Sequence, residues 1–244
     1  MNKQRCKKFV SIFLVATMLC SISMVNSLAF TSPTHEYTTK NGLRIVKETM
    51  KEPYLQFYTG EIESDLYEYC VRPDFDENNG IFKWHFYNPA TEKNFMGETT
   101  SALTKFRDHY DEAVKAYKVG QEKKSWEELG RSLHFLEDIN TPVHTNSQKL
   151  SDAMSQVLFH ANFEKLCAEV QEDYCAEMTR GQMMYYLYNS TTQIAKSSAN
   201  LANDNYYAMM NKTATQTEIA GNAIINAQKS VAGVLYKFYQ DINS

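Results

Sequence analysis

Residues 131–147 read Arg-Ser-Leu-His-Phe-Leu-Glu-Asp-Ile-Asn-Thr-Pro-Val-His-Thr-Asn-Ser, and the rest of the chain is organised around this stretch. The segment that leads into it predicts a helix capped by Ser125, with Glu128 completing a capping box. Asn140 and Pro142 predict the end of this helix, because the residue before a proline is pushed out of the helical region.

Three side chains of this stretch are potential metal ligands. His134 and Asp138 are four residues apart, so they project from one face of the helix, and His144 follows just after its expected end. The same spacing recurs at His160 and Glu164. One isolated pair of this kind is more often a surface hydrogen bond. Two such pairs with a histidine between them favour a metal site of imidazole and carboxylate ligands.

The run from His134 to His144 has the frame His-x-x-x-Asp-x-x-x-Pro-x-His, which resembles the signature of the bacterial zinc-dependent phospholipases C. This is the family of the clostridial alpha-toxin catalytic domain, and it shares its fold and three-zinc site with the fungal single-strand-specific nucleases. The resemblance implies an all-α fold, a single compact multi-helix domain. The family usually has other residues at four non-ligand positions: Tyr at Phe135, a small residue at Glu137, Ala or Pro at Thr145, and Asn at Ser147.

Residues 1–29 have the features of a secretory signal peptide. Lys and Arg side chains precede an apolar core over residues 9–25, and Ser27 and Ala29 suit cleavage after Ala29. The apolar run is short for a membrane span, so we expect cleavage and secretion rather than anchoring. Residues 30–244 then form one zinc-dependent phospholipase C-like catalytic domain, which is long enough for a sizeable core.

The charge of the chain is acidic. It carries 25 Lys and Arg against 29 Asp and Glu, and removing the four basic side chains of the signal peptide takes the formal charge from −4 to about −8. Such a chain has no general attraction for phosphate backbones, so we expect no stable nucleic-acid partner. We expect a monomer. Cys70, Cys167 and Cys175 cannot all pair internally, and the sequence leaves open whether Cys167 and Cys175 form a bridge.

The resemblance implies a role for the new amino terminus. In this fold family the free amino group and carbonyl of the first mature residue bind one zinc together with an early histidine. Phe30 and His35 match these places, with Phe30 where the family has Trp and a spacing like that of the fungal nucleases. Without the resemblance, His35 would be interpreted as part of a disordered tail. The resemblance also makes signal cleavage an activation step.

Residues 72–89 read as an acidic loop that leads to His85 among aromatic side chains. The phospholipases C carry a Pro-Asp-aromatic-Asp loop before a His-Phe-aromatic-Asx-Pro run, and its aspartate and histidine are ligands of one zinc. The resemblance gives these roles to Asp74 and His85, with Asp76 as the alternative aspartate.

Phe75 and Phe82 fall where the family has aromatic residues that contact a choline headgroup, which aromatic faces recognise by cation–π attraction. The chain has 16 Tyr and 13 Phe, so aromatic side chains alone identify no substrate. Of the six histidines, five match ligand positions of the family, and we interpret the sixth, His109, as a surface or structural residue.

Helical periodicity covers much of the remaining chain. It extends over residues 41–70, with an interruption at Pro53, and over residues 100–118 and 151–172. Residues 179–242 predict two further helices. We interpret their apolar stripes as core.

The resemblance implies three zinc ions (Zn2+). Their ligands are Asp74, His85, His134 and Asp138 for the first, Asp138, His35 and the Phe30 terminus for the second, and His144, His160 and Glu164 for the third. Neighbouring zinc ions clamp a phosphodiester and acidify water. Asp74 would orient that water or accept its proton as the catalytic residue.

Three functions remain open on this basis. The first is a phospholipase C that acts on phosphatidylcholine-like lipids at a membrane surface and releases diacylglycerol and a phosphorylated headgroup. The second is a single-strand-specific nuclease, which the short spacing from Phe30 to His35 favours. The third, a non-catalytic zinc-binding protein, requires a lost ligand, and every expected ligand is present.

Overall fold

The computed structural model describes residues 31–145 and 153–244, with the side chains of 153–157 excepted. The predicted signal peptide, Phe30 and Ser147 therefore lie outside the described residues. The α-helices are α2 (Ser32–Met50), α3 (Tyr54–Phe57), α4 (Glu61–Tyr69), α5 (Pro73–Asp76), α6 (Ala102–Lys118), α7 (Glu122–Asn140), α8 (Ala153–Val170), α9 (Arg180–Tyr188), α10 (Thr191–Met210) and α11 (Gln216–Ile242). Short 3₁₀ turns are η1 (Lys83–His85), η2 (Pro142–His144) and η4 (Gln171–Asp173). The described ranges contain no strand beyond one isolated bridge between Asn88 and Lys93, so the all-α prediction is confirmed.

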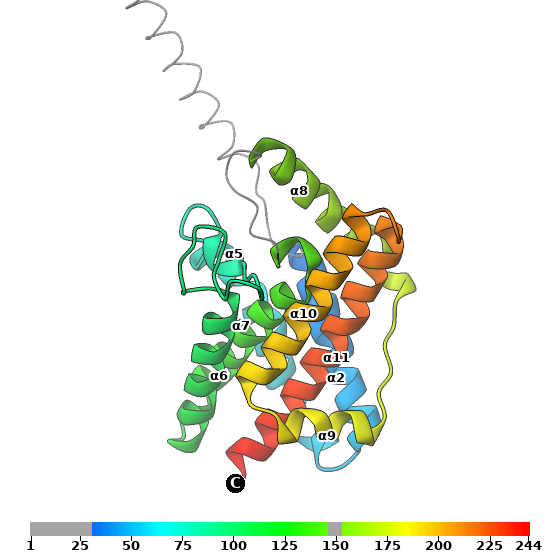
Figure 1. Ribbon diagram of the computed structural model, residues 1–244. Coiled ribbons are helices and arrows are strands. Elements are labelled where there is room, and N and C mark those ends of the chain that lie inside the picture. The colour runs from blue at the N-terminus through cyan, green and yellow to red at the C-terminus, as the bar shows by residue number, and fades with distance from the viewer. Residues whose placement is uncertain (1–30, 146–152) are drawn as a thin grey trace, which may run out of the picture.

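Helix α7 is the centre of the bundle. It packs against α4, α6, α10 and α11, and α2 lies along α11 (Figure 1). The second half of α7 is buried on all sides, from Ser132 to Asn140. A helix surrounded in this way has no solvent face, so its polar side chains need partners inside the protein. Figure 1 shows α5 and α8 at one end of the bundle, and α9 with the C-terminus at the other.

The predicted start of α7 is wrong. The helix begins at Glu122, and Ser125 lies inside it rather than at its cap. The hydroxyl of Ser125 donates to the carbonyl oxygen of Ala113 at 2.8 Å, so this buried serine binds α6 instead of capping its own helix. The predicted end is confirmed, because α7 stops at Asn140 and Pro142 begins η2.

Two other predicted segments are divided further. The helical pattern over residues 41–70 is divided among α2, α3 and α4, with a cis peptide bond before Pro53. Residues 179–242 form three helices rather than two, because Ser190 starts α10 with a capping box that includes Gln193. The helix predicted over residues 100–118 is confirmed as α6.

Two glycines allow helices to approach closely. A Cβ on Gly42 would lie 2.3 Å from Val231, so the glycine lets α2 lie against α11. A Cβ on Gly130 would lie 2.6 Å from the side chain of Tyr69, so α7 reaches the end of α4. This second contact brings the carbonyl group of Cys70 to the inner face of α7, where the candidate site lies.

The three cysteines among the described residues are free, with Cys70 and Cys167 buried and Cys175 exposed, so Cys167 and Cys175 do not form a bridge. None of the described helices combines the length and the apolar character that crossing a membrane would require.

Candidate metal centre

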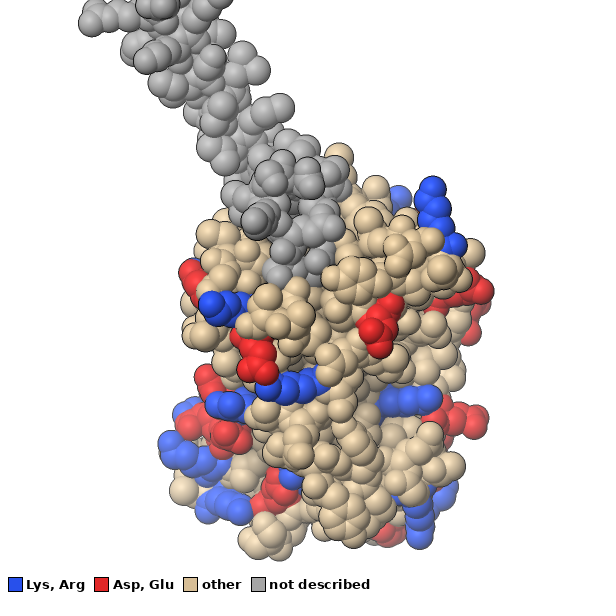
Figure 2. Space-filling model, in the orientation of Figure 1, with Lys and Arg blue, Asp and Glu red and all other residues tan. Residues whose placement is uncertain are grey.

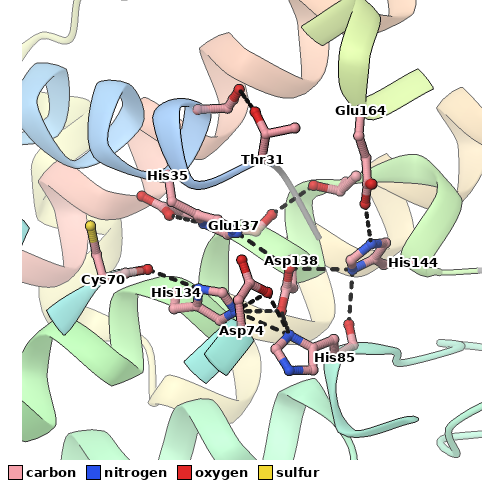
Figure 3. Close-up of polar contacts among 12 residues, drawn as sticks. Thr31, His35, Cys70, Asp74, His85, His134, Glu137, Asp138, His144 and Glu164 are labelled. Atoms are coloured by element: carbon pink, nitrogen blue, oxygen red, sulfur yellow. Dashed lines mark hydrogen bonds and ion pairs between the residues drawn. The ribbon is translucent and has the colours of Figure 1, made fainter. Parts of the chain in front are cut away.

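The centre is built on two successive turns of α7. His134 and Asp138 are fully buried and point from one face of the helix, as the spacing predicts (Figure 3). The turn η2 then brings His144 back toward them. Its Nδ1 lies 3.3 Å from Oδ1 of Asp138.

His85, from η1, joins this pair. Its Nδ1 lies 2.9 Å from Oδ2 of Asp138 and 3.0 Å from Nε2 of His134. The other ring nitrogen of His134 donates to the carbonyl oxygen of Cys70 at 2.8 Å. This hydrogen bond places the proton of His134 on Nδ1, so the lone pair of Nε2 is directed at the cluster.

Asp74, on the short helix α5, completes this part of the site. Its Oδ1 lies 3.6 Å from Nε2 of His134 and 3.8 Å from Nδ1 of His85. Both carboxylate oxygens are buried, and neither has a hydrogen-bond partner among the described residues. Asp76, the alternative from the sequence, points elsewhere and forms an ion pair with Arg131 at 2.7 Å.

A second group of ligand atoms lies beyond His144. Its Nε2 is 2.7 Å from Nε2 of His160 and 3.2 Å from Oε1 of Glu164, and the latter two atoms are 2.7 Å apart. His144 Nδ1 is 3.0 Å from the carbonyl oxygen of His85, and the ring of Phe86 stacks on His144. Helix α8 thus supplies the predicted pair of residues at a spacing of four.

His35 lies at the opposite end of the centre. Its ring stacks on that of His134 at 4.0 Å, and its Nε2 is 3.8 Å from Oδ1 of Asp138. Its Nδ1 forms a 2.5 Å hydrogen bond with Glu137. The structure therefore brings together all the predicted ligands that it describes, whereas Phe30 lies outside the described residues.

The donor set suits a metal ion. Three groups have ligand atoms that all lie within 4.8 Å of one another: His35, Asp74 and His134; His85, His134 and Asp138; and His144, His160 and Glu164. Buried nitrogen and oxygen donors without a thiolate are typical zinc ligands. The buried carboxylate of Asp74, whose oxygens accept no hydrogen bond from the described residues, would be costly as an anion without a nearby cation.

The protonation states agree with this role. Burial, reinforced by His85, lowers the pKa of His134 to about 4 against the opposing effect of Asp138. Burial also lowers the pKa of His35 well below its usual value, with His134 adding to the effect. Both imidazoles are therefore neutral at pH 7, which is the form that binds metals.

The carboxylates and His144 differ in charge. Burial and then Asp138 raise the pKa of Asp74 well above its usual value. Burial also raises the pKa of Asp138, but His134, His85 and His144 outweigh it and hold that pKa well below the usual range. The pKa of His144 is raised to about 10, because Asp138 and Glu164 together outweigh its burial. A metal ion bound by His144, His160 and Glu164 would displace the extra proton of the His144 imidazole.

The two predicted substrate residues lie differently. The ring of Phe82 is 5.5 Å from that of His85, next to the cluster. Phe75 is 63% exposed and has no place inside the centre.

Sequence reasoning missed Glu137 and the carbonyl group of Cys70 as parts of the site. A backbone carbonyl gives no signal in a sequence. Glu137 did give a signal in the sequence, because it is a charged residue on the helix turn between His134 and Asp138, which is buried. His109 is structural as predicted. It hydrogen-bonds to Glu77 and Glu128 and stacks on Phe135.

Comparisons with known proteins agree with this arrangement. The sequence model of the family described as zinc dependent phospholipase C matches residues 34–217, well over half of the chain. The chain belongs to this family. The prediction from the histidine pattern is thereby confirmed.

Relatives within the family are distant. A phospholipase C of Clostridium perfringens is 24% identical, and the match covers 84% of this chain and 53% of that protein. A phospholipase C of Bacillus cereus is also 24% identical, covering 73% of this chain and 69% of that protein. The chain thus spans about half the length of the Clostridium perfringens relative.

The fold is likewise shared. The alpha toxin from Clostridium absonum superposes with a TM-score of 0.75 at 22% identity, covering 86% of this chain and 64% of the toxin. A Clostridium perfringens alpha-toxin superposes with a TM-score of 0.71 at 24% identity. Both comparisons support the zinc phospholipase C fold.

Proposed function

We propose that this protein is a secreted zinc-dependent phospholipase C. It hydrolyses the phosphodiester of phosphatidylcholine-like phospholipids to diacylglycerol and a phosphorylated headgroup. The observation that carries the proposal is the unbroken buried series of ligand groups from His35 through Asp138 and His144 to Glu164. Relatives in the same family are named phospholipase C, which supports the reaction.

We further propose that the centre binds three zinc ions. Their proposed positions are at Asp74, His85, His134 and Asp138; at Asp138, His35 and the Phe30 amino terminus; and at His144, His160 and Glu164. Bound zinc supplies positive charge for the phosphodiester oxygens and lowers the pKa of water from about 15.7 toward about 7.

Asp74 is the proposed catalytic residue among the protein's own groups. Its carboxylate lies beside the rings of His85 and His134, next to where a metal-bound water would be held. Both of its oxygens lack hydrogen-bond partners among the described residues, so one could bind the metal ion while the other orients the attacking water and takes its proton. Asp138 stays ionised between the imidazoles and holds them in place.

The surroundings of the centre are compatible with a lipid substrate. Phe75 and Ile81, on the segment that leads to His85, are 63% and 51% exposed. Exposed apolar side chains next to a site favour contact with an apolar ligand or surface. Phe75 and Phe82 are the proposed contacts of a choline headgroup. On the face drawn in Figure 2, Lys and Arg lie among Asp and Glu rather than in a continuous basic strip.

Processing belongs to the same proposal. Cleavage after Ala29 would free the amino group of Phe30, five residues before His35. The mature chain would be a secreted monomer.

The test is hydrolysis by the chain that begins at Phe30. Phosphatidylcholine and single-stranded DNA are offered in parallel, each with added zinc and with a chelator. We expect chelator-sensitive release of phosphocholine. Chelator-sensitive cleavage of DNA alone would replace the proposal with the alternative, a single-strand-specific zinc nuclease. Inactivity toward both substrates with zinc bound would contradict both functions.

A further inference from the structure

Glu137 is a buried carboxylate next to the centre that is not among the ligands implied by the family resemblance. It lies on α7 directly before Asp138 and is fully buried. Burying a carboxylate is costly unless its oxygens find partners, and this cost calls for a reason.

Both oxygens of Glu137 have partners on α2. Oε2 lies 2.5 Å from Nδ1 of His35, and Oε1 accepts a hydrogen bond from the hydroxyl of Thr39 at 2.9 Å. These partners are about 100 residues away in the sequence, so the contacts exist only in the folded bundle. Figure 3 shows the carboxylate of Glu137 directed at the ring of His35.

The contact determines which edge of His35 faces the centre. With Nδ1 held by Glu137, Nε2 is directed at Oδ1 of Asp138, 3.8 Å away. The stacking of His35 on His134 at 4.0 Å limits rotation of the ring. An imidazole that donates its Nδ1 proton to a carboxylate presents the lone pair of Nε2, the form needed for a metal ligand.

We propose that Glu137 is a positioning residue for His35. It holds the proton of His35 on Nδ1 and fixes the ring so that Nε2 serves as a zinc ligand at the Asp138 end of the centre. The inference rests on the proposed function for the identity of the metal. It adds that this part of the site is assembled by contacts between α2 and α7 within the folded bundle.

The test measures bound zinc directly, in the chain that begins at Phe30, by metal analysis after dialysis and by competition with a chromophoric chelator. We expect Glu137→Ala to weaken binding at one zinc site by about 10–100-fold while the other sites keep their affinity. Glu137→Gln keeps an acceptor for His35 and can still pair with Thr39. It should therefore fold like the wild type and lose less affinity than Glu137→Ala.

Two control variants separate positioning from a structural role. Thr39→Val removes the hydrogen bond from Thr39 to Glu137 and leaves the side chains of His35 and Thr38 in place. Glu128→Gln alters a similar pair between two helices: Glu128, on α7 like Glu137, lies 2.7 Å from Nδ1 of His109 on α6. Both variants should bind zinc as the wild type does. An equal loss in Thr39→Val would show that Glu137 only joins the two helices, and would overturn the proposal.

Nitrogen chemical shifts of His35 give an independent readout. In the zinc-loaded wild type we expect the proton on Nδ1, and in Glu137→Ala a weaker preference for that form. A proton on Nε2 in the wild type, or unchanged zinc affinity in Glu137→Ala, would overturn this proposal and leave the proposed function standing. A wild-type chain that binds no zinc would overturn both.

Discussion

At the scale of single residues, Asp138 links the parts of the centre. His85 and His144 approach its two oxygens at 2.9 and 3.3 Å, and His35 lies 3.8 Å away. No other described carboxylate lies within 4.0 Å of all three of these rings. Loss of its charge therefore weakens the centre at several points together.

We predict that Asp138→Asn lowers both zinc affinity and phospholipid hydrolysis by more than about 100-fold. This is a larger loss than the roughly 10–100-fold typical of mutating a residue that only hydrogen-bonds to a metal ligand. The helices should remain, because asparagine has nearly the same shape. Zinc analysis, turnover and circular dichroism measure the three effects. Asp76→Asn is the matched control, since Asp76 pairs with Arg131 outside the cluster. Near-normal turnover in Asp138→Asn would contradict the proposed mechanism.

The residues of the centre differ in how far the sequence could reveal them. His134 with Asp138, and His160 with Glu164, could be found from the geometry of one helix turn alone. The choice between Asp74 and Asp76 could not, because it depends on which way a four-residue helix faces. The contact of Glu137 with His35 is a tertiary contact that no local pattern contains.

At the scale of elements, a polar network holds α5 against α6 and α7. Glu77, just after α5, accepts hydrogen bonds from Lys105 at 2.6 Å, from Arg131 at 2.8 Å and from His109 at 3.2 Å. These contacts hold the pKa of Glu77 well below its usual value, although burial opposes them. Because α5 carries Asp74, the network also sets where that carboxylate lies.

The network predicts a pH dependence of stability. Burial alone would lower the pKa of His109, but its hydrogen bonds with Glu128 and Glu77 outweigh it and raise the pKa above 6.5. A group whose pKa is higher in the folded state than in the unfolded chain stabilises the fold when it is protonated. This contribution is complete below the unfolded pKa of about 6.5 and is lost as the pH rises through the folded pKa. His109→Gln should therefore cost about 1–2 kcal/mol more at pH 5.5 than at pH 9.

Urea unfolding of both proteins with a chelator present measures this difference, since the metal ligands titrate alike in the two chains. A cost of His109→Gln that is the same at both pH values would show that the histidine acts only through packing on Phe135.

The ends of the helices also show that a local sequence pattern fails where a tertiary contact decides the structure. The end of α7 could be predicted because Pro142 restricts the backbone locally. Its start could not, because Ser125 binds the carbonyl group of Ala113 on a neighbouring helix, and that contact prevails over the local capping pattern. A capping box also divides α9 from α10 within a stretch whose apolar pattern suggests one helix.

At the scale of the whole molecule, the bundle encloses a charged centre instead of an apolar core at one end. Elements from distant parts of the chain meet there: α2, α5, η1, α7, η2 and α8. Without a cation, buried carboxylates and imidazoles face one another with incomplete hydrogen bonding, which opposes folding. With a cation, the same side chains become links between elements that share few other contacts. Metal binding is therefore coupled to the stability of the whole fold.

We predict that removing zinc lowers the melting temperature. A ligand at 100 times its Kd stabilises the folded state by about 2.7 kcal/mol per site. For a chain of this size, 1 kcal/mol corresponds to about 2–4 °C, so each occupied site should add about 5–10 °C. Scanning calorimetry with zinc, with a chelator and with magnesium measures the effect, and magnesium should not replace zinc at nitrogen-rich sites.

His109→Gln should keep the full zinc-dependent shift in melting temperature and Asp138→Asn should lose most of it, because His109 lies outside the centre and Asp138 within it. Equal melting temperatures with zinc and with chelator would mean that the buried ligands do not hold a metal.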